Sequence, residues 1–372
     1  MYPFSIFTQI NEFNEVQIVS LNSRNTSKMA KIKTEAIVLI QKGNAQNAFE
    51  KRAIELNEPK NKEVLIEVES FGLNYADVMA RNGLYREAPP MPCVIGYEVV
   101  GMVTKVGENA SSNWIGKRVV AFCRFGGYSK HVVTNDTAIV EIEDMNAGDA
   151  LALCTQSVTA YYMAEYLSPV RDGDHVLIHA AAGGVGTILI QLAKKRGAIV
   201  FAKIGSENKR ALVKSLGADF VINYNQSDYE VQIEKLLNGE RLDISYNPVA
   251  GSTFKKDFKL LGSGGRLVLF GGSEMSGTKW GFFSTLNFVR KMGFMLPIGL
   301  MMRSKNVLGV NMLKIADNKP KIMTHCLQEV INLYKQKEIT PQVGGIFPVS
   351  DISKAHEALE NGKTIGKLII NW

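Results

Sequence analysis

The stretch HVLIHAAAGGVGTILIQLAKKRGA (residues 175–198) places alanines and glycines between an apolar run and an amphipathic run. Glycine lets a ligand approach the backbone closely, and the first turn of a helix presents unpaired N–H groups. Such a turn binds pyrophosphate; the alternative is a tight turn that serves only packing. Because a strand precedes it and a helix follows, we favour a phosphate site, although Ala181 replaces the first glycine of the usual G-x-G-x-x-G pattern. The candidate residues are Ala182, Gly183, Gly184 and Val185.

The next expected strand, AIVFAKI, bears on the choice of cofactor. NAD-binding domains place an acidic residue about twenty positions beyond the glycines, where it holds the ribose hydroxyls. No acidic residue occurs from Thr187 to Ser206, and the expected position lies near Lys203. Gly205 gives room, Lys209 gives positive charge, and Tyr224 can reach the same pocket with its hydroxyl. The sequence therefore predicts NADPH; the alternative is that both lysines are solvated and Tyr224 only packs.

Two patterns along the chain indicate the elements that hold these residues. From about 31 to 150, short β-type runs alternate with turns, which predicts a compact, mostly β domain. From about 150 to 312, strands alternate with helices, which predicts a doubly wound parallel sheet. The tail has a helix at about 318–337, a second helix and a final strand, GKLIINW. We expect this tail to rejoin the first domain.

Composition excludes several classes of function. The net charge of +7 is dispersed and no nucleic-acid module is recognisable, so no nucleic-acid partner is expected. The four cysteines are far apart, which suits a reducing cytoplasm rather than a disulfide framework. No apolar run has the length of a membrane span. We treat residues 1–30 as a poorly ordered extension or a misplaced start, since Met29 is a more natural beginning.

The Met- and Phe-rich segment 280–302 is broken by Arg290, Lys291 and Pro297. It fits an apolar lid over a large substrate, a contact with a membrane surface, or simple packing against the cofactor domain or a partner subunit. We favour packing, because methionine commonly fills gaps.

Several motifs together resemble the medium-chain dehydrogenase/reductase superfamily: AAAGGVG, FGLNYADVMARNGLY, PCVIGYEVVGMVTKVG and the terminal GKLII. They are most similar to its zinc-free quinone oxidoreductase branch. The stretch from CTQSVTAYYMAEY to LGVNMLK is similar to the vesicle amine transport protein group of that branch. The resemblance implies a GroES-like β-rich domain (31–155, with a C-terminal return over 313–372) and a Rossmann NADPH-binding domain (156–312). The nicotinamide would lie in the cleft between them.

Zinc-dependent members of this superfamily hold a catalytic zinc with a cysteine and a histidine. Asn74 and Tyr97 stand at those two positions, and neither side chain is a normal zinc ligand. The closely spaced cysteines of the structural zinc lobe are absent as well. His175 and His179 lie on an expected buried strand, where hydrogen-bonded core residues are more common than ligands. We therefore predict that no zinc is bound.

The resemblance also suggests roles for individual residues. The catalytic candidates are Tyr75, beside the nicotinamide ring, and Tyr85, in the substrate pocket; the alternative for each is packing. A tyrosine hydroxyl can donate a hydrogen bond or a proton to a developing enolate. Asp77 is interpreted as a structural hydrogen-bonding residue. Further cofactor contacts are Asn74 at the nicotinamide ribose, Thr159 on the nicotinamide side, Asn247 and Phe270 at strand ends, and Lys367 on the returning strand.

The leading hypothesis is a reductase that transfers hydride from NADPH to quinones or α,β-unsaturated carbonyls. Two alternatives remain: a non-catalytic NADPH-binding scaffold, and an enoyl-thioester reductase with the same fold and cofactor. We also expect a homodimer joined through the last Rossmann strand, near NVLGVNM, because an open apolar edge strand favours aggregation.

Overall fold

The computed structural model describes residues 31–275 and 281–372, with the side chains of 281–285 left out. The expected N-terminal extension, 1–30, lies outside the described residues, as does the beginning of the Met- and Phe-rich segment.

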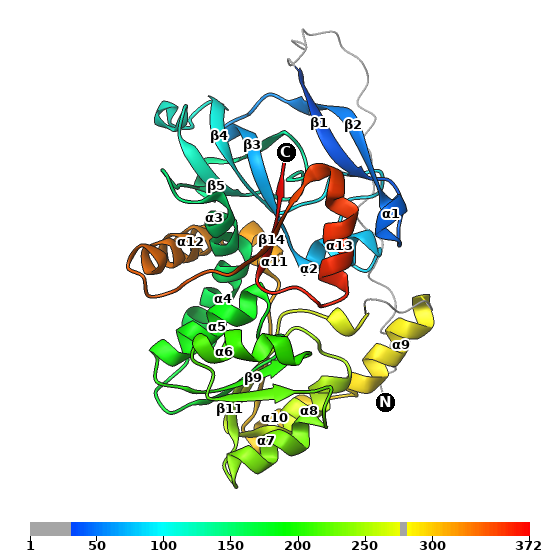
Figure 1. Ribbon diagram of the computed structural model, residues 1–372, viewed down its shortest axis with the longest axis vertical. Coiled ribbons are helices and arrows are strands. Elements are labelled where there is room, and N and C mark those ends of the chain that lie inside the picture. The colour runs from blue at the N-terminus through cyan, green and yellow to red at the C-terminus, as the bar shows by residue number, and fades with distance from the viewer. Residues whose placement is uncertain (1–30, 276–280) are drawn as a thin grey trace, which may run out of the picture. The chain divides into compact units, whose positions relative to one another are not determined.

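A six-stranded parallel sheet forms the cofactor-binding half predicted from the alternation of strands and helices (Figure 1). The strand order is β10-β9-β8-β11-β12-β13. From β8 the chain adds β9 and β10 on one side, and it then adds β11, β12 and β13 on the other side, as in a doubly wound sheet. All five neighbouring pairs are parallel. The strands are β8 (His175–Ile178), β9 (Ile199–Ile204), β10 (Phe220–Asn223), β11 (Leu242–Asn247), β12 (Leu261–Leu269) and β13 (Asn306–Gly309).

Helices cover both faces of this sheet, because alternate side chains of each strand are apolar on both faces. Val176 and Val200 pack against α5 (Gly184–Lys195) and α6 (Arg210–Ser215) on one face. Leu177 and Phe201 pack against α7 (Tyr229–Leu237) and α8 (Ser252–Leu260) on the other face. In a doubly wound sheet the ligand crevice lies outside the carboxyl ends of the strands, where the strand order changes between β8 and β11.

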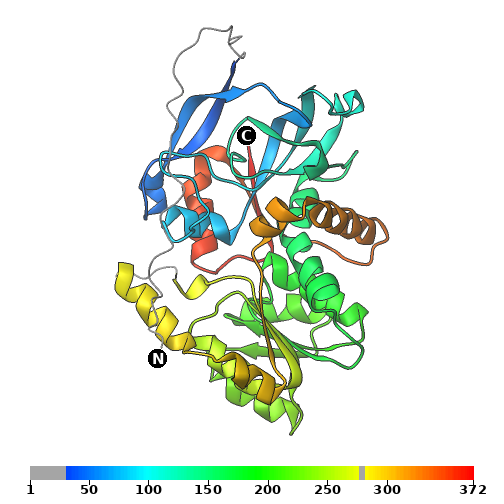
Figure 2. The same ribbon diagram turned by 180° about the vertical axis from the view of Figure 1, so that it is seen from behind.

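The second large sheet is mostly antiparallel and belongs to the β-rich half (Figure 2). Its order is β14-β15-β3-β4-β5-β7, and β6 pairs with β3. A separate hairpin pairs β1 with β2, and β2 was not predicted because its side chains are mostly exposed and polar. The strands are β1 (Lys31–Leu39), β2 (Phe49–Asn57), β3 (Glu63–Leu73), β4 (Glu98–Val106), β5 (Arg118–Phe122), β6 (His131–Asn135), β7 (Ile139–Glu141), β14 (Val343–Pro348) and β15 (Lys367–Asn371).

The C-terminal part of the chain returns to this sheet. β15 pairs antiparallel with β3 and parallel with β14, so the last strand lies within the β-rich sheet. A helical stretch leads from the β-rich half into the parallel sheet and includes π-helical turns at Leu153–Ser157 and Tyr162–Leu167. The remaining helices are α1 (Ala45–Ala48), α2 (Tyr75–Arg81), α3 (Ala147–Ala152), α4 (Val158–Tyr161), α9 (Gly281–Met292), α10 (Pro297–Arg303), α11 (Met312–Asn318), α12 (Pro320–Lys335) and α13 (Ile352–Glu360).

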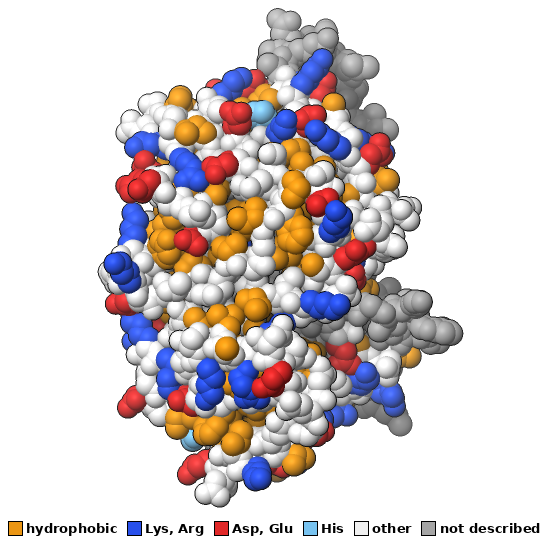
Figure 3. Space-filling model, in the orientation of Figure 1, with side chains coloured by type: hydrophobic (Ala, Val, Ile, Leu, Met, Phe, Trp, Pro, Cys, Tyr) orange, Lys and Arg blue, Asp and Glu red, His pale blue; other side chains and the backbone are white. Residues whose placement is uncertain are grey.

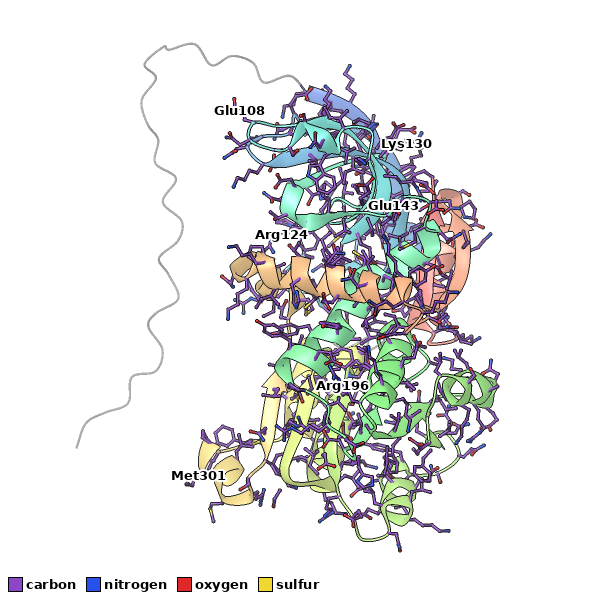
Figure 4. All side chains as sticks on the ribbon, turned by 90° about the vertical axis from the view of Figure 1, so that its left-hand side faces the viewer. Glu108, Arg124, Lys130, Glu143, Arg196 and Met301 are labelled. Atoms are coloured by element: carbon purple, nitrogen blue, oxygen red, sulfur yellow. The ribbon has the colours of Figure 1, made fainter. Side chains whose placement is uncertain are left out.

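The described part of the segment 280–302 divides its side chains between core and solvent. Met292, Met295 and Leu300 pack against the apolar cluster under α8. Phe294 is 91% exposed, and Met301 is directed away from the parallel sheet on α10 (Figure 4). Within the described residues, no helix combines the length and the hydrophobicity that a membrane crossing requires.

The helix α5 approaches the end of β8 so closely that only glycine fits at position 186. A Cβ there would lie 2.5 Å from the Ala180 carbonyl oxygen and 2.7 Å from the Ala181 Cα, which are backbone atoms that cannot move aside. We predict that Gly186→Ala lowers the free energy of unfolding by about 1–3 kcal/mol in urea denaturation.

The matched control is Gly299→Ala in α10, where a Cβ would meet no atom within 4 Å. This change should leave stability unchanged or raise it by up to about 1 kcal/mol, because alanine favours a helix. Equal effects of the two substitutions would contradict the packing argument.

Candidate cofactor and substrate site

The predicted phosphate turn connects β8 to α5. Ala180 adopts a left-handed conformation with φ of 48°, and its carbonyl accepts a hydrogen bond from Gly183 N at 2.8 Å. Gly183 caps α5, so the N–H groups of Gly184 and Val185 open the helix. Those groups lack partners within the helix and lie at the positive end of its dipole. The turn has the geometry that binds a phosphate group.

Gln156 lies against this turn and was not identified from the sequence. A Cβ on Gly184 would fall 1.5 Å from Gln156 Oε1, so the carboxamide occupies the space that a side chain would take. That oxygen is buried and has no hydrogen-bond partner among the described residues. Gln156 comes from the π-helical turn Leu153–Ser157, a feature often found at functional sites. Its only sequence signal is its place within CTQSVTAYY.

The returning C-terminal segment runs beside the glycine turn. Gly366 N donates to the Ala182 carbonyl oxygen at 2.9 Å, and Gly183 and Gly366 form a parallel bridge. Ala182 is buried, whereas Gly183, Gly184 and Val185 are partly exposed. The structure therefore brings the loop before β15 to the edge of the predicted phosphate site.

The three residues predicted to hold the adenosine phosphate lie at the ends of β9 and β10. A Cβ on Gly205 would lie 2.6 Å from the Tyr224 hydroxyl, so a side chain at this position would displace the tyrosine from the turn. Tyr224 is 49% exposed. Lys209 is largely buried, which lowers its pKa, and its Nζ donates to the Gly362 carbonyl oxygen at 2.6 Å.

Two more charged residues, Lys203 and Glu207, lie near this turn. Lys203 is only 6% exposed, so it is not a solvated surface lysine. Glu207 is an acidic residue three positions beyond the end of β9. Its carboxylate accepts hydrogen bonds from Arg210 and Asn223, so the protein itself holds it.

Asn247 and Phe270 lie at the ends of β11 and β12, where the parallel sheet opens. Asn247 is fully buried; its Oδ1 accepts from Val249 N and Ala250 N, and its Nδ2 donates to Asp257 Oδ2 at 2.6 Å. The side chain of Asn247 thus shapes the turn after β11 and presents no free amide group. Phe270 is partly exposed and packs at the margin of the larger core.

Asn74 and Lys367 meet in a buried polar cluster together with Glu98 from β4. Lys367 Nζ forms an ion pair with Glu98 and donates to Asn74 Oδ1 at 2.8 Å, and Asn74 Nδ2 donates to Glu98 Oε1 at 2.8 Å. Glu98 Oε2 accepts from Thr155 N at 2.6 Å. Lys367 and Glu98 have no exposed surface. The cluster fixes Asn74, and through Thr155 it fixes the helical stretch that carries Gln156.

The remaining nicotinamide-side candidates lie close to this cluster in the sequence. Thr159 in α4 is nearly buried, and its hydroxyl donates to the Thr155 carbonyl oxygen at 2.6 Å. Tyr75 is the first residue of α2, directly after Asn74, and is partly exposed. Both residues therefore follow positions that the buried ion pair holds in place.

Tyr85 faces Tyr97 edge-on, with ring centroids 6.2 Å apart. Burial, together with the charges of Glu87 and Asp77, raises the pKa of Tyr85 to about 12, so its phenol is a hydrogen-bond donor at neutral pH. Asp77 has no exposed surface, and burial raises its pKa to about 7. Its Oδ2 accepts from Asn74 N at 2.8 Å in a capping box, a structural role for this carboxyl group.

The donor set around Asn74 and Tyr97 offers no normal metal site. Over residues 31–275 and 281–372, no three or more His, Cys, Asp or Glu side chains are grouped so as to hold a metal ion. The backbone N–H groups at Gly184 and Val185 and the Lys209 ammonium instead suit an anionic dinucleotide.

A cavity of about 660 Å³ is formed by α8, α10 and the residues that precede β11 and β13. None of the predicted site residues lines it. Arg241 and Lys305, which directly precede β11 and β13, lie on its wall together with Lys259 in the last turn of α8. The glycine turn instead follows the carboxyl end of β8.

Comparisons with known proteins agree with this geometry. Residues 184–334 match the family of zinc-binding dehydrogenases, and residues 60–144 match the alcohol dehydrogenase GroES-like domain. A mouse (Mus musculus) protein named synaptic vesicle membrane protein VAT-1 homolog-like is 30% identical over 319 residues, covering 84% of this chain and 76% of that protein. This chain belongs to the medium-chain dehydrogenase/reductase superfamily.

Two further proteins are similar to this medium-chain dehydrogenase/reductase. The zebrafish (Danio rerio) synaptic vesicle membrane protein VAT-1 homolog is 29% identical over 313 residues, covering 84% of this chain but only 64% of its own length. The structure of Escherichia coli quinone oxidoreductase complexed with NADPH matches with a TM-score of 0.79 and 26% identity, over 91% of this chain and 100% of that one. The predicted GroES-like and Rossmann fold is confirmed.

The buried ion pair gives a prediction about stability. Lys367→Met leaves the Glu98 carboxylate buried without its partner and should lower the free energy of unfolding by about 3–5 kcal/mol. The double variant Lys367→Met with Glu98→Gln removes that charge and should recover part of the loss. Urea denaturation of the single and double variants measures both effects.

The exposed pair Lys117–Glu141, with a 2.7 Å contact, is the matched control. Lys117→Met should change stability by less than about 1 kcal/mol. A double variant at 367 and 98 that is no more stable than Lys367→Met alone would show that the unpaired charge is not the cause.

Proposed function

We propose that the protein is a zinc-independent reductase that transfers hydride from NADPH to quinones or α,β-unsaturated carbonyls. The observation that most supports it is the turn Gly205–Lys209, which follows the second strand of the parallel sheet and provides a buried lysine. The carboxylate in this turn, Glu207, accepts hydrogen bonds from Arg210 and Asn223 within the protein. The NADPH complex of the related E. coli quinone oxidoreductase supports the same cofactor.

In this proposal, different groups of the protein bind different parts of the cofactor. The first N–H groups of α5, at Gly184 and Val185, hold the pyrophosphate, and Lys209 with Tyr224 holds the 2′-phosphate at Gly205. Lys209 can donate to a phosphate while it keeps its bond to Gly362, because an ammonium has three donors. On the nicotinamide side, Asn74 is held by Lys367 and Glu98, and Thr159 and Tyr75 complete the contacts.

The chemistry at the substrate follows from the groups near Tyr85. NADPH, when bound, supplies the hydride. The hydride adds to the electron-poor carbon of the substrate, and negative charge develops on the substrate oxygen. The resulting anion takes up one proton from solvent. Tyr85, protonated at neutral pH, is placed as a hydrogen-bond donor to that oxygen. Such substrates delocalise charge onto oxygen, so no metal ion is needed to polarise them.

We further propose that the protein acts in the cytoplasm as a homodimer joined through β13. Among the described strands, β13 pairs only with β12, so one edge of it is unpaired. α10, directly before β13, exposes Ile298, Met301 and Met302, and Met301 is labelled in Figure 4. Charged side chains of both signs are interspersed on the face seen in Figure 3, which fits a small-molecule enzyme better than a nucleic-acid-binding protein.

A non-catalytic scaffold is the second candidate, and the names of the mouse and zebrafish relatives favour it. Those proteins are named for a synaptic vesicle membrane and not for a reaction. A scaffold would bind NADPH and oxidise none of it.

The first test of the proposed function is cofactor choice. We predict that the parent protein binds NADPH at least about tenfold more tightly than NADH, which corresponds to about 1.4 kcal/mol. Lys209→Ala should remove most of that preference and leave NADH affinity nearly unchanged, because only NADPH has the 2′-phosphate. Titration by fluorescence or calorimetry gives both dissociation constants.

The control variant is Lys214→Ala, an exposed lysine on α6 that donates to the Asp219 carbonyl oxygen. It should leave both affinities unchanged. If Lys209→Ala weakens the two cofactors equally, Lys209 does not contact the 2′-phosphate.

The second test is turnover. We predict oxidation of NADPH with a panel of quinones and enones, unaffected by a chelator, with less than about 0.1 zinc per chain by elemental analysis. Tyr85→Phe should lower kcat/KM for enones by about tenfold to a hundredfold, because the donor to the substrate oxygen is lost.

Tyr166→Phe is the control, since that ring is 53% exposed and stacks on Tyr162 away from Tyr85. An enoyl thioester belongs in the same panel. Tight NADPH binding with no oxidation by any member would establish the scaffold, and exclusive turnover of the thioester would establish the enoyl-thioester reductase.

A further inference from the structure

A buried charged cluster lies beneath the Gly205 and Tyr224 site, on the face of the parallel sheet covered by α7 and α8. It consists of His179 after β8, Lys203 on β9, Tyr229 at the start of α7 and Asp257 on α8. These side chains are between 0% and 6% exposed. A lysine so deeply buried is uncommon and needs compensating partners.

Asp257 is the anchor of this cluster. Its carboxylate accepts hydrogen bonds from His179 Nε2 at 2.9 Å, from Tyr229 OH at 2.8 Å and from Ser245 Oγ at 2.8 Å, besides the bond from Asn247. Burial alone would raise the pKa of Asp257, but His179 and these donors hold it below its usual value. Asp257 therefore remains an anion inside the protein.

His179 transmits the position of Asp257 to Lys203. Burial lowers the pKa of His179, so its imidazole is neutral. Since Nε2 donates to Asp257, Nδ1 is left as an acceptor, and Lys203 Nζ lies 3.2 Å from it. The three side chains form one hydrogen-bonded chain that ends on the Lys203 ammonium.

Lys203 presents this ammonium to two tyrosine rings. Its Nζ lies 3.8 Å from the centroid of Tyr229 and 5.0 Å from the centroid of Tyr224, both within the range of a cation–π interaction. Tyr229 is buried, whereas Tyr224 is half exposed and lies with its hydroxyl against Gly205. The buried cation thus contacts from below the ring whose hydroxyl lies in the proposed 2′-phosphate site.

We propose that Lys203, held by His179 and Asp257, is a positioning residue that fixes Tyr224 and raises the affinity for the 2′-phosphate of NADPH. This inference rests on the proposed NADPH-dependent function and adds to it a determinant that no motif of the glycine turn contains. Lys203 acts through Tyr224 and through its charge, and it needs no direct contact with the cofactor.

A dependence on pH follows from this arrangement. Burial lowers the pKa of Lys203 to about 8. Asp257 on α8, Asp228 at the start of α7 and Glu274 favour its charged form, and Lys256 on α8 opposes it. Because the folded-state pKa is lowered, the ammonium is present below pH 8 and is lost as the pH rises through 8. The 2′-phosphate stays doubly charged above pH 7, since its second pKa is about 6.

The test measures the ratio of NADH to NADPH dissociation constants between pH 6.5 and 9.5. In the parent protein this ratio should fall above a midpoint near pH 8. Lys203→Met should lower the ratio at pH 7 by about tenfold and make it independent of pH, with NADH affinity changed less than about twofold. Lys203→Arg should keep the preference to pH 9.5, because a guanidinium does not deprotonate in this range.

Lys305→Met is the matched control: Lys305 is also a lysine over an aromatic ring, 4.9 Å from the Phe258 centroid, and its Nζ donates to the Phe258 carbonyl oxygen. It should leave the ratio and its pH profile unchanged. If Lys203→Met does not fold, Lys203→Arg still tests the inference, because its affinity ratio should show no midpoint near pH 8.

Three outcomes overturn the inference. A pH midpoint that persists in Lys203→Arg or Lys203→Met assigns the titration to another group, such as Lys209. Equal weakening of both cofactors by Lys203→Met assigns Lys203 a purely structural role. If the parent protein shows no preference for NADPH at pH 7, both the proposed cofactor and this inference are refuted. If the preference is lost in Lys209→Ala but retained in Lys203→Met, only the inference is refuted.

Discussion

The buried ion pair between Lys367 and Glu98 is the interaction on which the geometry of the site depends. Two opposite charges without exposed surface stay in a protein only when they are paired and their remaining hydrogen bonds are made. Here Asn74 and the Thr155 amide make them. The pair joins the last strand, a central strand of the β-rich sheet, the start of α2 and the helical stretch that leads into the parallel sheet. This one cluster therefore holds Asn74 and the helical stretch that carries Thr159.

The glycines of the turn between β8 and α5 allow close packing within the protein, besides the phosphate binding proposed for them. Gly186 lets α5 approach the Ala180 carbonyl, and Gly184 leaves space that the Gln156 carboxamide enters. Gly366 from the C-terminal loop bonds to Ala182 and bridges Gly183. The amino end of α5, the proposed phosphate site, is thus bordered by segments far apart in the sequence, and its small residues also contact the C-terminal return.

Charge is arranged differently on the two sides of the proposed cofactor site. Near the substrate, burial raises the pKa of Tyr85 to about 12, so its hydroxyl is a neutral donor at neutral pH. Near the adenosine, Lys209 and Lys203 are cations whose pKa values burial lowers. A hydride acceptor is best surrounded by donors that stabilise a developing oxyanion, whereas a phosphate needs positive charge. The separation of the two environments fits a hydride transfer from a phosphorylated dinucleotide.

The sequence by itself determined the fold class, because strand and helix periodicities, the glycine turn and the family motifs are local patterns. It also predicted that Gly205 and Tyr224, at the ends of consecutive strands, lie together, and the structure places them side by side. The binding role predicted for them and for Lys209 stays a prediction. It missed β2, whose exposed polar side chains give no burial pattern, and it missed Gln156 and Glu98. Only the tertiary structure showed that Asn74 and Lys367 are joined through Glu98, and that Asn247 uses its amide within the protein. The burial of Lys203 was likewise not evident from the sequence, because a lone lysine is normally solvated. His179 and Asp257, which come from other elements, provide the partners that make its burial possible.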